Sequence, residues 1–137
     1  MKISIAKTKE ELLQAFFIRR EVLIEEKKYS IYKDEPDKDD LVSDIYIAKD
    51  KSKVVGTARI RKERMAYRIQ RMAIVKHAKG KGIGSKIMKK ILQDQKNKKI
   101  SLISPKETIP FYEKFGFKKT DIIQKGKYHK YYRLQNY

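Results

Sequence analysis

Hydrophobic and polar positions at the start of the chain follow patterns that predict a strand and then a long helix. Ile3 and Ile5 alternate with polar neighbours, which is typical of a short strand. Thr8, followed along the same turn by Glu11, forms a capping box that opens a helix. The apolar residues of this helix recur with a period of roughly 3.6 residues, at Leu12, Leu13, Phe16, Phe17, Leu23 and Ile24.

The middle of the chain predicts three more strands. The runs 44–49 and 54–60 are rich in β-forming residues and are joined by the polar turn 49–52, so they predict a hairpin. The run 67–75, YRIQRMAIV, predicts the next strand, and it ends directly before a glycine-rich segment.

The second half of the chain predicts a helix, a strand, a short helix and closing strands. From Ile83 to about Asn97 the apolar residues occupy one helical face, and 99–104 resembles a short buried strand. The stretch 109–115, with Pro early and Gly116 after its end, predicts a short helix. Closing strands are expected from Phe117 onward and over 128–134. This order predicts an α/β (α+β) fold with a mixed sheet.

Composition limits the classes of site that the chain can hold. A length of 137 residues suits one domain, expected over 1–137. The absence of cysteine excludes disulfides, thiolate metal ligands and a cysteine nucleophile. His77 and His129 lie far apart with no metal-binding spacing, so we expect no metal. Charged residues interrupt the apolar N-terminal segment, so we expect no membrane association and a cytoplasmic protein.

The net charge of +18 attracts polyanions in general, whether nucleic acid or a phosphate-rich cofactor. A solvated lysine-rich surface is the preferred interpretation, and a nucleic-acid-binding module is the alternative. The stretch 21–44 is acidic instead, and it either lines an acceptor site for a cationic amine or forms a solvated loop. Its acidic residues are Glu21, Glu25, Glu26, Asp34, Glu35, Asp37, Asp39, Asp40 and Asp44.

The strongest chemical signal is the loop KGKGIGS at 79–85, between the strand 67–75 and the predicted helix. Glycines let the backbone turn tightly beside a ligand, and the first turn of a helix presents unpaired N–H groups that suit a diphosphate. The spacing fits neither a Walker A loop nor GxGxxG, which disfavours an ordinary NTPase or dinucleotide-binding domain. The alternative is a loop that only connects two elements.

These residues also resemble a known family. The segment RMAIVKHAKGKGIGSKIMKKIL looks like the acetyl-CoA signature of the GNAT superfamily, with Lys79 in place of the usual Arg or Gln. IPFYEKFGF resembles the second signature, and FIRREVLIEEKK, VVGTARI and KGKYHKYYRL resemble an ElaA-like branch. The resemblance covers nearly the whole chain. It implies a mixed, mostly antiparallel twisted sheet of six to seven strands with helices on both faces.

The resemblance implies an N-acetyltransferase that uses acetyl-CoA as co-substrate, without a metal, by direct transfer in a ternary complex. The pantetheine arm would pair with backbone of the splayed strand, and one N–H there would polarise the thioester carbonyl. The cofactor-binding residues expected on this basis are Met72, Ala73, Ile74, Lys79, Gly80, Lys81, Gly82, Ile83, Gly84 and Ser85.

Tyr112 is the candidate general acid, because a phenol can donate a proton to a departing thiolate of similar basicity. Members of the family often place a glutamate base on the strand before the loop, but Ile69–Met72 contains none. Glu21, Glu25 and His129 are the candidates for the base, each with a plain structural role as the alternative. The acceptor is expected to be an amine-bearing small molecule or peptide and the protein a monomer or homodimer. A regulator that binds acyl-CoA without catalysis is the remaining alternative.

Overall fold

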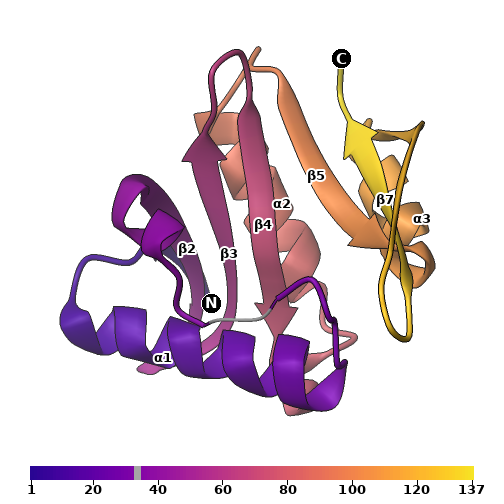
Figure 1. Ribbon diagram of the computed structural model, residues 1–137. Helices are drawn as coiled ribbons and strands as arrows, with labels where there is room; N and C mark the ends of the chain where they lie inside the picture. The colour runs from indigo at the N-terminus through magenta and orange to yellow at the C-terminus, as the bar shows by residue number, and fades with distance from the viewer. Residues whose placement is uncertain (33–34) are drawn as a thin grey trace.

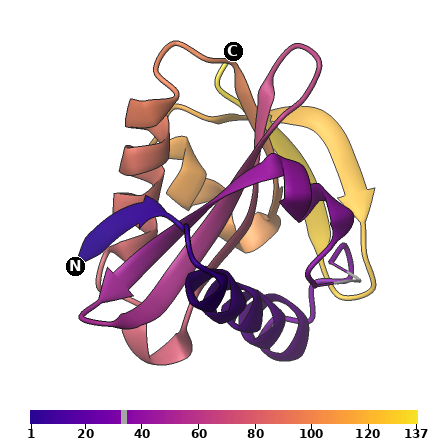
Figure 2. The same ribbon diagram turned by 90° about the vertical axis from the view of Figure 1, so that its left-hand side faces the viewer.

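A computed structural model describes residues 1–32 and 35–137 (Figure 1). Lys33 and Asp34, including the Asp34 of the acidic stretch, lie outside the described residues. Seven strands form one twisted sheet in the order β1-β2-β3-β4-β5-β7-β6 (Figure 2). The strands are β1 (Lys2–Ile5), β2 (Ser43–Asp50), β3 (Lys53–Lys62), β4 (Tyr67–Ile74), β5 (Ile100–Pro105), β6 (Lys118–Lys125) and β7 (Lys130–Gln135). Neighbouring strands pair antiparallel except β4 and β5, which pair parallel.

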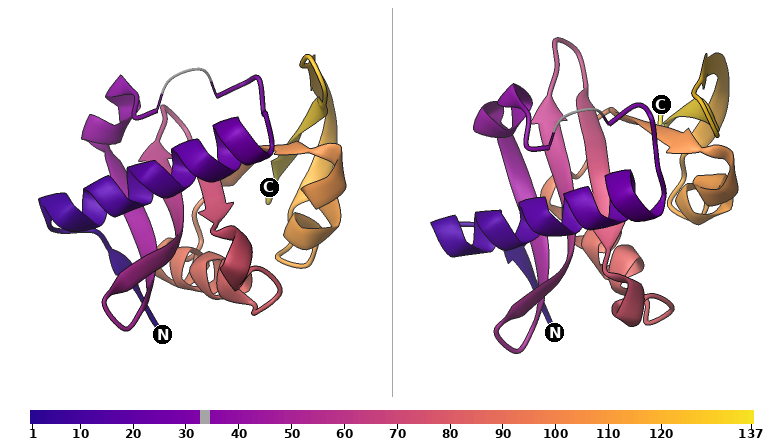
Figure 3. Two further views of the ribbon diagram at one scale, coloured as in Figure 1. Left: turned by 90° about the horizontal axis from the view of Figure 1, so that it is seen from below. Right: turned by 60° about the horizontal axis from the view of Figure 1, so that its bottom comes forward.

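Helices cover both faces of the sheet. Helix α1 (Lys9–Arg19) crosses one face and α2 (Ile83–Asp94) lies against the other (Figure 3). The short α3 (Ile109–Glu113) lies beyond β5. Single 3₁₀ turns are η2 (Lys38–Val42), η3 (Lys76–Ala78) and η4 (Lys106–Thr108). The fold predicted from the sequence is thus confirmed.

The first helix starts as predicted and ends differently. The Glu11 N–H donates to Thr8 Oγ1 at 3.1 Å and the Thr8 N–H to Glu11 Oε1 at 3.3 Å, so the capping box is present. After Arg19 the helix continues as a π-helical turn, η1 (Arg20–Glu26), in which the Lys27 N–H donates to the Val22 carbonyl at 2.9 Å. The prediction of a single α-helix is therefore wrong in its second part, because the hydrogen bond there joins residues that are five apart in the chain instead of four.

The boundaries of the later helices are shorter than predicted. Helix α2 ends at Asp94 and not at about Asn97, because the backbone leaves the helical conformation at Gln95, with a φ of −108° and a ψ of 37°. Helix α3 ends at Glu113, two residues before the predicted end. The apolar face of α2 is fully buried on the sheet at Ile87, Met88 and Ile91, as its pattern predicts.

The sheet opens between β4 and β5, and this opening positions the functional site. Parallel pairing runs only from Tyr67 opposite Ile100 to Ile69 opposite Leu102. Beyond it, Arg71 and Met72 together stand opposite a single residue of β3, and Arg71 has a φ of 59°. A bulge of this kind bends its strand. Strand β5 meanwhile stays paired with β7 through Pro105, so β4 and β5 diverge.

Three carboxylates of the acidic stretch are paired with buried arginines. Asp40 accepts from Arg19 Nη1 at 2.7 Å and from Arg59 Nη1 at 3.0 Å, and Asp37 accepts from Arg59 Nη1 at 2.6 Å. Glu35 pairs with Arg19 and, at 2.5 Å, with Arg71 Nε. The sequence left two interpretations of this stretch: a wall of the acceptor site, or a solvated loop. Both are wrong for Glu35, Asp37 and Asp40, because these carboxylates are paired with arginines and are not free to attract an amine.

Candidate active site

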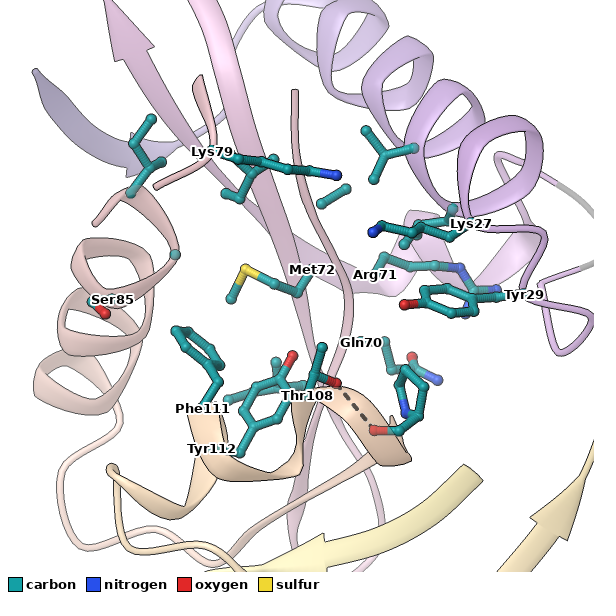
Figure 4. A pocket seen from close by; sticks show the side chains of 18 of the residues that line it. Lys27, Tyr29, Gln70, Arg71, Met72, Lys79, Ser85, Thr108, Phe111 and Tyr112 are labelled. Atoms are coloured by element: carbon teal, nitrogen blue, oxygen red, sulfur yellow. Dashed lines mark hydrogen bonds between the residues drawn. The ribbon is translucent and has the colours of Figure 1, made fainter. Parts of the chain in front are cut away.

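A cavity of about 430 Å³ occupies the opening between β4 and β5 (Figure 4). Its walls come from η1, the segment after η1, the bulged half of β4, the loop before α2, and α3. The lining residues predicted from the sequence are Met72, Ala73, Ile74, Lys79, Gly80, Gly82, Ile83, Gly84, Ser85 and Tyr112. Lys81 is exposed beside the cavity and is not part of its lining.

The loop before α2 has the backbone geometry that its glycines predict. Gly80 and Gly82 adopt φ values of 80° and 75°, a left-handed conformation that other residues rarely take. Gly82 is the N-cap of α2 and no side chain caps the helix there; the Lys86 N–H is bonded to the Gly82 carbonyl at 3.1 Å. The preceding N–H groups of the first turn are therefore left to bind a ligand, and the helix dipole favours an anionic one.

Gly84 has a different role. A Cβ atom at Gly84 would stand 3.3 Å from Phe111 Cζ, so the glycine lets the Phe111 ring approach α2 closely. Phe111 lines the cavity next to Tyr112, and its ring packs edge-on against the Tyr112 ring. The glycine thereby brings α3 and the start of α2 to the same cavity.

The edge of β4 offers backbone groups to the same space. The Val75 N–H donates to the Val55 carbonyl at 3.0 Å, and Ala73 pairs with Thr57, so both face β3. Successive N–H groups of a strand point to opposite edges. Those of Met72 and Ile74 therefore point toward the opening, where β5 has diverged.

Tyr112 lies with its hydroxyl in the cavity, opposite the β4 edge (Figure 4). Its side chain is nearly inaccessible, and no group in the described part of the chain is hydrogen-bonded to the hydroxyl. Burial raises the pKa of Tyr112 well above its usual range, and the nearby Tyr32 and Tyr29 raise it further. The phenol is therefore protonated at any physiological pH.

The other proposed catalytic residues lie outside the cavity lining. His129 stands behind Tyr29, with its ring centroid 4.9 Å from the tyrosine ring. Its Nε2 lies 3.1 Å from the Lys27 carbonyl and its Nδ1 3.4 Å from Glu107 Oε1. Glu25 is exposed on η1 and pairs with Arg20 at 3.9 Å, and Glu21 is exposed on the same turn. The positions of Glu21 and Glu25 give no support to a catalytic role.

Several lining residues escaped the sequence analysis. Tyr29 and Tyr32 follow η1, and the Tyr29 hydroxyl donates to Glu107 Oε1 at 3.2 Å. Burial, and then the Glu107 charge, raises the pKa of Tyr29 above its usual range. Gln70 and Thr108 also face the cavity. Two tyrosines within a charged stretch were the signal that could have indicated this wall.

Lys79 lines the cavity and connects two of the segments that surround it. Its Nζ lies 2.5 Å from Glu26 Oε1, which joins the glycine loop to the end of η1. The hydrogen bond from Lys79 holds the pKa of the Glu26 carboxyl below its usual range. Within 1–32 and 35–137 no group of three His, Cys, Asp or Glu side chains could hold a metal ion. No helix in the described ranges has the length and apolar character needed to cross a bilayer.

Known proteins share this architecture and part of this sequence. The family model described as an acetyltransferase (GNAT) domain matches residues 42–119. An uncharacterized N-acetyltransferase of Bacillus subtilis, YjcF, is 31% identical over 121 residues, which cover 86% of each chain.

Two crystal structures match the fold over nearly the full length of both chains. An acyl-CoA N-acyltransferase from Pseudomonas aeruginosa has a TM-score of 0.89 at 18% identity and covers 100% of each chain. Escherichia coli ElaA has a TM-score of 0.85 at 18% identity and covers 99% of this chain and 97% of its own. The cavity between the diverging strands and the matches in sequence agree: the chain belongs to the GNAT family and is an N-acetyltransferase.

Proposed function

We propose that the protein transfers the acetyl group of acetyl-CoA directly to a primary amine. The observation that carries this proposal is that one cavity joins the uncapped start of α2, the open edge of β4 and the Tyr112 hydroxyl. These parts suit, in turn, a diphosphate, an amide-bearing arm and a departing thiolate.

The residues of the cavity fit the co-substrate. The N–H groups of Ile83, Gly84 and Ser85 at the start of α2 would hold the diphosphate, with Lys79 as a nearby cation. The N–H groups of Met72 and Ile74 would bind the amide-rich arm as an added strand does. One of them would donate to the thioester carbonyl and stabilise the negative charge that develops on its oxygen.

In the transfer, the amine nitrogen attacks the thioester carbon, the C–S bond breaks, and the sulfur leaves as a thiolate. Tyr112 stays protonated because burial raises its pKa, and it donates to that sulfur. No covalent enzyme intermediate is required, and the chain has no cysteine to form one.

The amine must also lose a proton, and we propose a route through Tyr29, Glu107 and His129. The Lys27 carbonyl can only accept, so His129 Nε2 carries a hydrogen and Nδ1, facing Glu107, takes up the incoming proton. The amine would give its proton to the Tyr29 oxygen while Tyr29 passes its own proton to Glu107. Glu107 would then pass a proton on to His129 Nδ1. His129 thus acts from behind the cavity wall, and Glu25 has no part in this route.

Calorimetry with acetyl-CoA and with CoA, together with a thiol-release assay over a panel of amines, tests the proposal. We expect both nucleotides to bind and thiol release to depend on an added amine. If neither nucleotide bound, or no amine in a broad panel accelerated thiol release, the proposed reaction would be wrong.

A further inference from the structure

A second cavity of about 160 Å³ adjoins the first, on the side where β4 still pairs with β5. The two cavities share the residues Tyr32, Ile69, Gln70, Arg71 and Ile103. Only the second is lined by Ile31, Arg68 and Gln124. A molecule whose amine reaches the transfer site from this side would place its remaining groups here.

The polar groups of the second cavity are mainly hydrogen-bond donors. Gln70 Oε1 accepts from Arg59 Nη2 at 2.7 Å, and because arginine cannot accept, this bond fixes the orientation of the amide. No group in the described part of the chain is bonded to the Gln70 amide nitrogen, which is left to donate. Arg68 Nε lies 2.7 Å from Glu63, while its terminal nitrogens form no hydrogen bond within 1–32 and 35–137.

Arg71 is fixed in place beside these donors. Its Nε lies 2.5 Å from Glu35 and its Nη2 donates to Asp37 at 2.9 Å, and its guanidinium carbon stands 4.3 Å from the Tyr32 ring centroid. The burial of this ion-paired group holds Tyr32 and the β4 bulge in a set position. Gln70 is held by Arg59, and Arg68 by Glu63, so these two donors are arranged before a ligand arrives, which reduces the entropy lost on binding.

Among residues 1–32 and 35–137, no Asp or Glu is part of the lining of either cavity. Lys27 and Lys79 line the first cavity, Arg68 lines the second and Arg71 lines both. Lys79, Arg68 and Arg71 are each paired with a carboxylate that lies outside the lining. A second ammonium group on the acceptor, as in a polyamine, would find no unpaired carboxylate among these neighbours, because Glu63, Glu35 and Asp37 are already paired with arginines. An oxyanion would meet two kinds of donor, an amide and a guanidinium, and bonds of this kind to charged groups are the strong ones.

We infer that the acceptor of the proposed transfer carries a carboxylate beside its amine, and that this carboxylate binds at Arg68 and Gln70 in the second cavity. The inference rests on the proposed function and narrows its acceptor class. It replaces the expectation of a cationic acceptor that the acidic stretch suggested.

Matched acceptors test the inference: a series of ω-amino acids of two to six carbons, the alkylamines of the same lengths, and the corresponding diamines. For at least one length we expect kcat/KM for the amino acid to exceed that of the alkylamine and the diamine by about tenfold or more. Arg68→Gln should lower kcat/KM for the amino acid more than for the alkylamine, and so remove this preference. Arg64→Gln, an exposed arginine outside both cavities, is the control and should preserve the preference.

Equal or better rates for diamines at every length, or a preference that survives Arg68→Gln, would overturn the inference while leaving acetyl transfer intact. If no amine were acetylated, the binding of the acetylated products would still test the carboxylate site. Calorimetry in the presence of CoA would compare N-acetyl ω-amino acids with N-acetyl alkylamines, and equal affinities would refute the carboxylate site. Absence of CoA binding in the same cell would identify a failure of the proposed function itself.

Discussion

Single glycines in the left-handed backbone conformation determine the shape of the loop before α2. Gly82 has a φ of 75° and nothing lies within 4 Å of an added Cβ, so a substitution there strains the backbone without a clash. Gly82→Ala should lower the unfolding free energy by about 1–2 kcal/mol, the usual penalty of the left-handed conformation. Because relaxation moves the N–H groups of α2, we also expect acetyl-CoA affinity to fall, measured by calorimetry.

Gly116 supplies the matched control. It has a φ of 90° with no atom near an added Cβ, and it lies outside the cavity. Gly116→Ala should cause a similar loss of stability with unchanged acetyl-CoA affinity. Equal affinity losses in both variants would mean that the loop geometry has no special part in binding.

The proposed mechanism requires the Tyr112 hydroxyl as the proton donor to the leaving sulfur. Tyr112→Phe should lower kcat by about 100-fold, within the range of general-acid catalysis, with little change in acetyl-CoA affinity. Because burial raises its pKa, Tyr112 stays protonated, and the wild-type pH–rate profile should show no alkaline decline from this group up to about pH 10. Tyr128→Phe, exposed and outside the cavity, is the control. Unchanged turnover in Tyr112→Phe would remove Tyr112 from the mechanism.

At the scale of elements, the proton route joins three segments: the turn after η1, η4, and the turn between β6 and β7. Glu107→Gln should slow transfer to an alkylamine, which is protonated at neutral pH, by at least about tenfold. An aromatic amine such as aniline is already unprotonated at neutral pH, and after its attack the nitrogen is acidic enough to lose its proton to water, so its rate should hardly change. A merely structural role for Glu107 would slow both acceptors equally. Glu113→Gln, on the neighbouring α3, should affect neither.

The ion pairs around Asp40 fasten the segment 35–42 to α1 and β3. Burial works to raise the pKa of Asp40, but the hydrogen bonds from Arg19 and Arg59 outweigh it and hold the pKa below its usual range. Asp40→Asn should lower the unfolding free energy by about 3 kcal/mol, because two buried guanidinium groups lose a charged partner. Urea denaturation measures this, with the exposed Asp44→Asn as control. If the unfolding free energy fell no further than in the control, the remaining ion pairs would be sufficient to hold the segment 35–42 in place.

Local sequence signals were sufficient to predict most helices and strands and the side of the site that is formed by the glycine loop. The capping box of Thr8 and the left-handed glycines at 80 and 82 depend on neighbours a few residues away, so their structure follows from the sequence. The contact of Tyr29 with Glu107 depends on segments far apart in the chain, and no local pattern indicates it. The interpretations of the acidic stretch fail at Glu35, Asp37 and Asp40 for the same reason, since a count of charges does not show which carboxylates meet buried arginines.

For the whole molecule, the excess of lysine and the buried tyrosines act in opposite directions at high pH. Lysines lose their charge above about pH 10, which weakens self-repulsion in a chain of high positive charge and stabilises the fold. Burial raises the pKa of Tyr32 to about 12. An unfolded tyrosine ionises near pH 10, so between the two values the unfolded state binds fewer protons and stability falls as pH rises.

Comparison with Tyr32→Phe isolates the tyrosine contribution, because the lysines are the same in both proteins. The difference in unfolding free energy, wild type minus variant, should stay constant below about pH 10 and then shift against the wild type. The shift should be about 1.4 kcal/mol per pH unit, and it should level off near the pKa of folded Tyr32 at about 12. Urea denaturation at intervals of half a pH unit measures it. A difference that stayed constant across this window would mean that Tyr32 ionises in the folded protein as readily as in the unfolded chain, so that the wall it shares between the two cavities is open to water.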